Sequence, residues 1–77
     1  MDTGYWINGG KIYGPVGFTG FYIRPDHRIT GLKGYTRHWI YQGQFYSQTS
    51  GNTGFRVVDE NRIHGPEPEP PWVRPTH

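Results

Sequence analysis

The chain contains no cysteine, and this absence excludes several ways of stabilising or activating a small protein. Without a thiol there is no disulfide bond, no cysteine ligand for zinc and no thiol nucleophile. The histidines are scattered, without the paired spacing that is typical of a metal site, at His27, His38, His64 and His77. We therefore expect neither a metal nor another cofactor.

Long apolar runs are also missing. No stretch approaches the ~20 consecutive apolar residues that span a bilayer, so we expect no membrane contact. The first residues, MDTGYWING, lack the basic start and the apolar run of a secretory signal. On these grounds the protein is expected to be soluble and cytoplasmic.

Charged residues make up only 18% of the chain, and the acidic ones occupy positions that favour structure over catalysis. Asp26, Asp59 and Glu60 fall in predicted turns, where a carboxylate commonly stabilises the turn by bonding to nearby backbone. The other acids lie near the ends of the chain. No serine stands in a nucleophile elbow, and no glycine pair precedes a helix as a phosphate-binding loop does. We therefore expect that the protein is not an enzyme.

Aromatic residues, by contrast, are abundant: the 77 residues include 3 Trp, 6 Tyr and 4 Phe, together with 12 Gly and 7 Pro. Aromatic residues favour strands, whereas glycine and proline favour turns. Disordered chains are poor in aromatics. The composition predicts one all-β domain. Because a single core of this size stabilises a fold weakly, it also favours a homo-oligomer.

A repeat organises residues 1–65. Successive units, of 16, 17 and 17 residues, each begin with a threonine, and the threonines are Thr3, Thr19, Thr36 and Thr53. After each threonine come an aromatic-rich triplet, a polar turn and an apolar residue. The triplets are Tyr5-Trp6-Ile7, Phe21-Tyr22-Ile23, His38-Trp39-Ile40 and Phe55-Arg56-Val57. Three units close with glycine, and the third has Ser47 instead. Such a period predicts a repeat architecture.

Each unit has the pattern of a β-hairpin. Gly9-Gly10 and Gln42-Gly43 suit two-residue loops that need a positive φ, and residues 25–27 and 59–61 suit three-residue loops. The predicted fold is all-β: four tandem β-hairpin repeats of 16–17 residues forming a small antiparallel meander, barrel or propeller-like domain over residues 1–65. The alternative is an irregular β domain with chance similarity between its segments.

Alternate strand residues point to opposite faces, so each hairpin has a core face and an outer face. The predicted core face consists of Tyr5, Ile7, Ile12, Phe21, Ile23, Ile29, His38, Ile40, Phe45, Phe55, Val57 and Ile63. The outer face pairs Trp6 with Tyr13, Tyr22 with Thr30, Trp39 with Tyr46 and Arg56 with His64. Phe18 and Tyr35, in the connectors, are expected to fill gaps between hairpins.

Residues 66–77 form a separate Pro-rich tail, which we expect to be extended and polyproline-like. Its apolar pair is Trp72-Val73. Three alternatives stay open for this tail. It is disordered, or Trp72 docks into an aromatic groove of its own domain or of a neighbouring subunit, or the tail is a linear motif for a proline-binding domain.

The outer face supplies the candidate site. Ligand or interface candidates are Trp6, Tyr13, Tyr22, Trp39, Tyr46 and Trp72, and a possible basic rim consists of Lys11, Arg28 and Arg62. The leading hypothesis is a non-enzymatic binding or structural module that self-associates through this face or contacts another protein. The alternatives are a carbohydrate-binding module that stacks sugars on Trp and Tyr, and a weak single-stranded nucleic-acid binder. Nucleic acid ranks last because residues 1–64 carry seven basic against four acidic residues, a net charge of only +3.

Two segments resemble known repeats. TGFYIRPDHRITGL resembles the aromatic hairpins of bacterial choline- and glucan-binding repeats, and YWINGGKIYG is similar to MORN repeats. Both families have longer periods, and this chain lacks the Tyr-x-Gly-x-Trp order of MORN units. The resemblance implies a hairpin array that binds or scaffolds, and it transfers no functional residue to this sequence.

Overall fold

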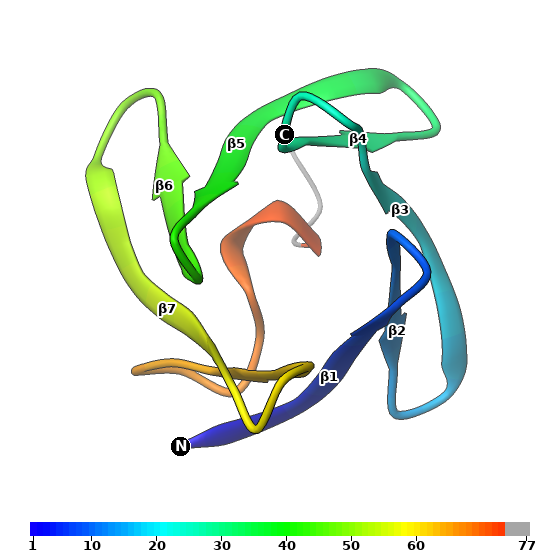
Figure 1. The fold of residues 1–77 in the computed structure, drawn as a ribbon, viewed down its shortest axis with the longest axis vertical. Helices are drawn as coiled ribbons and strands as arrows, with labels where there is room; N and C mark the ends of the chain where they lie inside the picture. The colour runs from blue at the N-terminus through cyan, green and yellow to red at the C-terminus, as the bar shows by residue number, and fades with distance from the viewer. Residues whose placement is uncertain (74–77) are drawn as a thin grey trace.

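The computed structural model describes residues 1–73, which form eight antiparallel strands closed into a barrel (Figure 1). The strands are β1 (Asp2–Asn8), β2 (Lys11–Gly14), β3 (Gly17–Ile23), β4 (Arg28–Gly31), β5 (Gly34–Tyr41), β6 (Gln44–Ser47), β7 (Gly51–Val58) and β8 (Arg62–His64). Each strand pairs with its neighbours in the sequence, and β8 pairs with β1. The all-β prediction is confirmed, and of the three arrangements left open the chain adopts the barrel.

The four predicted hairpins are present in the predicted register. Trp6 lies opposite Tyr13, Trp39 opposite Tyr46, and Arg56 opposite His64. The turn residues Gly9 and Gly10, at φ 59 and 77°, have the positive φ values that a two-residue hairpin loop requires. We call the end of the barrel that carries these turns the hairpin end, and the opposite end the connector end.

The threonine that begins each unit joins that unit to the one before it. Its hydroxyl donates to the carbonyl of the apolar residue on the preceding return strand, as in Thr19 to Ile12 at 2.6 Å and Thr36 to Ile29 at 2.7 Å. The same oxygen accepts the N–H two residues ahead. The ladder is bulged at these junctions, and the residue after each threonine has a positive φ. Glycine occupies three of these sites and Arg37, at φ 66°, the fourth.

The glycine that closes three of the units makes room for a ring from the same unit. A Cβ added to Gly14 would lie 2.8 Å from Tyr5, and one added to Gly31 would lie 2.7 Å from Phe21. In the third unit the pair opposite each other is His38 and Ser47. The closing residue that has a side chain, Ser47, therefore lies opposite a smaller ring, that of His38.

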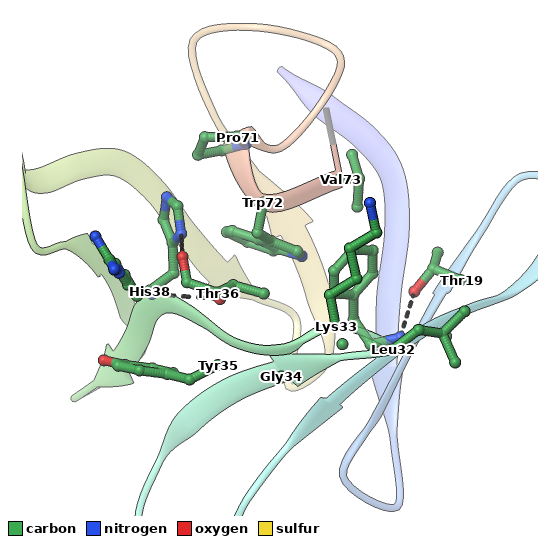
Figure 2. Close-up of a pocket in the computed structure, with 14 residues that line it drawn as sticks. Thr19, Leu32, Lys33, Gly34, Tyr35, Thr36, His38, Pro71, Trp72 and Val73 are labelled. Carbon is green, nitrogen blue, oxygen red and sulfur yellow. Dashed lines mark hydrogen bonds between the residues drawn. The ribbon is translucent and has the colours of Figure 1, made fainter. Parts of the chain in front are cut away.

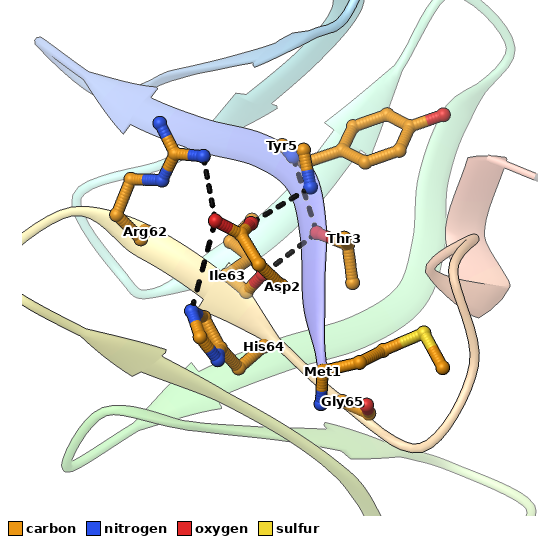
Figure 3. Close-up of polar contacts among 9 residues, drawn as sticks. Met1, Asp2, Thr3, Tyr5, Arg62, Ile63, His64 and Gly65 are labelled. Atoms are coloured by element: carbon orange, nitrogen blue, oxygen red, sulfur yellow. Dashed lines mark hydrogen bonds and ion pairs between the residues drawn. The ribbon is translucent and has the colours of Figure 1, made fainter.

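The first and last units meet in the same way as the others (Figure 3). Thr3 donates to the carbonyl of Ile63 at 2.7 Å, and Met1 and Gly65 exchange two backbone bonds of 2.9 and 3.0 Å. These bonds occupy the place that the Gly14 to Gly17 pair occupies at the first connector. The barrel is therefore closed by the repeat's own bonding pattern.

The core lies inside the barrel. Fully buried Ile12, Ile29, Phe45 and Ile63 are the return-strand residues of the four units. The other predicted core hydrophobics pack around them, so the predicted core face is confirmed. Within residues 1–73 there is no helix long and apolar enough to cross a membrane.

The tail folds back into the barrel, with a short 3₁₀ turn η1 (Pro71–Val73) at its inner end, shown orange to red within the ring of strands in Figure 1. Trp72 is only 5% exposed. Its ring centroid lies 4.6 Å from that of Phe45 and 6.3 Å from that of Phe55. Of the predicted tail, 66–77, the last four residues lie outside the described part.

Candidate functional site

Acidic and histidine side chains are candidates for metal binding and acid–base chemistry in the described part of the chain. Among residues 1–73 there is no group of three or more His, Asp and Glu that could hold a metal ion. The Asp2 carboxylate accepts the N–H of Gly4 at 2.8 Å and a guanidinium N–H of Arg62 at 2.7 Å (Figure 3). These two bonds, that of Gly4 first, lower the pKa of the carboxyl below its ordinary value.

His38 lies at the connector end of the interior, half-buried against Trp72, with the ring centroids 5.9 Å apart. Its Nδ1 is 3.0 Å from the carbonyl oxygen of Thr36, which can only accept, so this nitrogen carries the proton. Burial lowers the pKa of His38, and the bond to Thr36 opposes that shift in part. The neutral ring is thus held as a packing element.

A cavity of about 700 Å³ opens beside His38, between residues 31–37 and η1 (Figure 2). Its size is within the range of small-molecule sites. However, the hydroxyls of Thr19 and Thr36 on its wall are already bonded to backbone. The indole Nε1 of Trp72 has no acceptor, yet it is fully buried and offers no surface to a ligand. These three groups are therefore not open to a ligand, and the charged side chains on the wall are those of Lys33 and Arg37.

The outer surface of the barrel carries a continuous row of rings across β1 to β3. Trp6 and Tyr13 stack at 5.6 Å between centroids and an interplanar angle of 10°. Phe18 continues the row, 5.6 Å from Tyr13 and 5.4 Å from Tyr22. Phe18 is 45% and Tyr22 41% exposed. The row is thus joined ring to ring and open to solvent at one end.

A second group of rings lies on β5 and β6. Trp39 and Tyr46 stack at 6.0 Å and 10°, repeating the arrangement of the first hairpin. Tyr35, 43% exposed, lies beneath the guanidinium of Arg28, 5.3 Å from its ring centroid. We call the two groups together the aromatic flank. Its members are Trp6, Tyr13, Phe18, Tyr22, Tyr35, Trp39 and Tyr46.

The outer surface over β7, β8 and the adjoining ends of β1 and β6 is polar, because the fourth unit lacks outer aromatics. We call it the polar flank, and its members are Gln44, Asn52, Arg56, Arg62, His64 and Asp2. Several of these side chains bond to one another, as Asn52 does to Gln44 at 2.8 Å. His64 lies 3.9 Å from the Asp2 carboxylate. The outside of the barrel therefore carries two chemically distinct surfaces, which meet where Arg62 pairs with Trp6 and Asn52 with Tyr46.

The three basic residues expected to form a rim are divided between these surfaces. Lys11 lies over the Phe18 ring at 5.7 Å, and Arg28 lies over Tyr35. Arg62 instead pairs with Asp2 on the polar flank. The strand order thus brings Lys11 and Arg28 onto rings of the aromatic flank, whereas Arg62, across from Trp6 on the neighbouring strand, contacts Asp2 instead.

Comparison with known proteins identifies no relative. No family model, no curated protein and no solved structure matches this chain. The function must therefore be inferred from the surface itself.

Five of the six predicted aromatic candidates lie on the aromatic flank, and the structure places the sixth, Trp72, inside the chain's own barrel. The sequence prediction missed Phe18 and Tyr35, which it assigned to gaps between hairpins. Both are exposed on the outer surface instead. The register shift at each bulge turns them outward, beside Tyr13 and Thr30. Both residues end a Gly-x-x-Gly-aromatic segment, at 14–18 and 31–35, and this recurrence was the sequence signal that they occupy equivalent positions.

Proposed function

We propose that the protein is a non-enzymatic binding module whose partner contacts the aromatic flank. One observation carries the proposal: seven rings lie outside a barrel whose core is formed by other side chains and by Trp72. Rings in that position add little to the core. A contiguous apolar patch exposed on a small protein is typical of an interaction surface.

The partner predicted first from the sequence is a second copy of the chain. In a twofold dimer through this flank the same patch faces itself, so the cations at its edge would approach one another. Like charges brought together at an interface weaken association. Repulsion between these cations therefore opposes a dimer through this flank, and a concentration series of the protein alone tests it.

Carbohydrate is a second candidate because of the two stacked pairs. Trp6 with Tyr13 and Trp39 with Tyr46 lie at equivalent positions of the first and third hairpins, each with nearly parallel rings. Flat aromatic platforms on strands suit the apolar faces of sugars. The charged groups beside the flank would add nothing to the binding of a neutral sugar.

Backbone amide NMR of the ¹⁵N-labelled chain tests the proposal without assuming the partner. Three titrations are recorded: a concentration series of the protein alone, a panel of neutral oligosaccharides, and a single-stranded oligonucleotide. We expect at least one of them to move amides of the strands that carry the aromatic flank, β1 to β3, β5 and β6, while those of β7 and β8 stay still.

The double variant Phe18→Ser/Tyr22→Ser should abolish that response, and Asn52→Ser, on the polar flank, should leave it intact. If no titration moves the amides of the aromatic flank, or if the shifts fall on the polar flank, the proposal is wrong.

A further inference from the structure

The distribution of charge over the barrel narrows the choice of partner. Among the described residues, 11–41 contain five basic side chains and one acidic side chain, a net charge of +4. The basic ones are Lys11, Arg24, Arg28, Lys33 and Arg37, and the acid is Asp26. The other described residues contain two basic and five acidic side chains, a net charge of −3. The small overall charge therefore conceals a basic half, which spans β2 to β5, and an acidic half.

Two of the cations in the basic half lie directly on exposed rings. Lys11 Nζ is 5.7 Å from the centroid of Phe18, and the Arg28 guanidinium is 5.3 Å from that of Tyr35. The nearest acid to Arg28, Asp26, is 3.8 Å away and both side chains are well exposed, so this ion pair leaves most of the charge of Arg28 available. On the polar flank, by contrast, Arg62 is held by Asp2 at 2.7 Å.

The exposed rings of the two pairs lie on β3 and β5, with β4 between them, and Phe18 of the first pair contacts Tyr22 on the same strand. Thr30 on β4 lies opposite Tyr22 of β3 on one side and Tyr35 of β5 on the other. Neighbouring strands are about 4.8 Å apart, so β3 and β5 lie about 10 Å apart with a short side chain between them. A chain crossing from β3 to β5 would pass a ring, a short side chain and a second ring. The two cations lie over the rings of Phe18 and Tyr35.

We propose that the aromatic flank binds single-stranded nucleic acid across β2 to β5; this inference rests on the proposed binding function and names its partner. Unpaired bases stack on exposed rings, and neighbouring Lys and Arg contact the phosphates. A neutral sugar would stack on the rings but would gain nothing from the positive charges. In a twofold dimer through this surface, the cations of the two copies would face and repel each other. Duplex DNA keeps its bases stacked on each other, so only its phosphates would be available.

Fluorescence anisotropy with a fluorescein-labelled oligothymidine of about 12 nucleotides, a length that matches the usual span of such sites, tests the inference. A duplex of equal length and heparin serve as competing polyanions. We expect the single strand to bind at least tenfold more tightly than the duplex. Its affinity should fall with salt, because bound phosphates release counterions.

Matched variants separate stacking from charge. Tyr35→Ser should weaken binding of the oligonucleotide at least fivefold, whereas Tyr35→Phe, which keeps the ring, should change it less than twofold. Arg28→Ala should weaken binding and reduce the salt slope by about 1, and Arg56→Ala on the polar flank should do neither. Circular dichroism confirms that each variant keeps the barrel.

Each unfavourable outcome has a distinct meaning. If heparin and duplex bind as well as the single strand, and Tyr35→Ser has no effect, the surface is a general polyanion site and the inference is overturned. If the oligonucleotide does not bind while oligosaccharides or self-association move the flank in the NMR titrations, the inference fails and the proposed function stands. If nothing moves the flank, both fail.

Discussion

At the scale of single residues, the closing position of each unit shows how ring size and closing residue depend on each other. Gly31 leaves 2.7 Å between the place of a Cβ and the ring of Phe21, whereas Ser47 fits opposite the smaller ring of His38. The third unit therefore departs from the repeat at two positions together: it has a smaller ring, and its closing residue has a side chain.

We predict that Gly31→Ser lowers the free energy of unfolding by about 1–3 kcal/mol, because the added atoms overlap the Phe21 ring. Adding Phe21→His, which copies the third unit, should recover part of the loss. Urea denaturation of the two single variants and the double variant measures the coupling. Additive effects would show that the ring and the closing residue do not depend on each other.

His38 makes the stability of the protein depend on pH. Because its pKa in the folded state is lowered, the unfolded chain takes up a proton at a higher pH than the folded chain does. The stabilisation is therefore complete above the ordinary value of 6.5 and is lost as pH falls towards the folded-state pKa. The lowered pKa of Asp2 acts in the same direction, but only below its ordinary value of 3.8.

The expected result is a fall in the free energy of unfolding between about pH 7 and pH 5 that is smaller in His38→Gln than in the wild type. Urea titrations at a series of pH values measure it. The variant Asp2→Asn serves as the control, since it should change the profile only at more acidic pH. Identical profiles for wild type and His38→Gln would contradict the role given to burial of this ring.

At the scale of elements, the tail is part of the core. Trp72 contacts rings from β5, β6 and β7, and Pro70 beside it is fully buried. An eight-stranded barrel is just wide enough to be filled by side chains, and here a residue from outside the barrel strands fills part of it. The indole N–H has no acceptor, which subtracts from the benefit of burying this ring.

We therefore predict that Trp72→Ala lowers the free energy of unfolding by about 3–5 kcal/mol. Trp72→Phe should cost less than half as much, because it keeps an aromatic ring beside Phe45 and removes the unpaired N–H. Urea unfolding followed by far-ultraviolet circular dichroism provides both numbers. Equal losses for the two variants would show that the packing of a ring at this position contributes little.

At the scale of the whole molecule, ring closure couples the four units. Every strand has two hydrogen-bonded neighbours, so no hairpin can leave the barrel without breaking two ladders. The carbonyls that accept from the starting threonines also belong to the four return-strand core residues. Unfolding of one unit thus removes two strands of the barrel and one of its fully buried core residues.

A single cooperative unfolding transition is therefore expected. Trp72 reports on the interior and Trp6 and Trp39 on the outer surface, so tryptophan fluorescence and far-ultraviolet circular dichroism sample different regions. Their urea midpoints should coincide, as they do for a two-state domain. Separate midpoints would mean that one or more hairpins unfold independently and that closure does not couple the units.

The sequence by itself determined the repeat, the hairpins, their register and the inward face of each strand. These features are local: threonine spacing, turn residues such as Gly9-Gly10 and the alternation around Ile12 each act within about 17 residues. Only the tertiary structure decided that β8 closes on β1, that Trp72 packs in the interior, and that Lys11 and Arg28 contact rings while Arg62 contacts Asp2. Those outcomes depend on contacts between distant residues and on bulges that turn Phe18 and Tyr35 outward, and the period of a strand pattern carries no information about either.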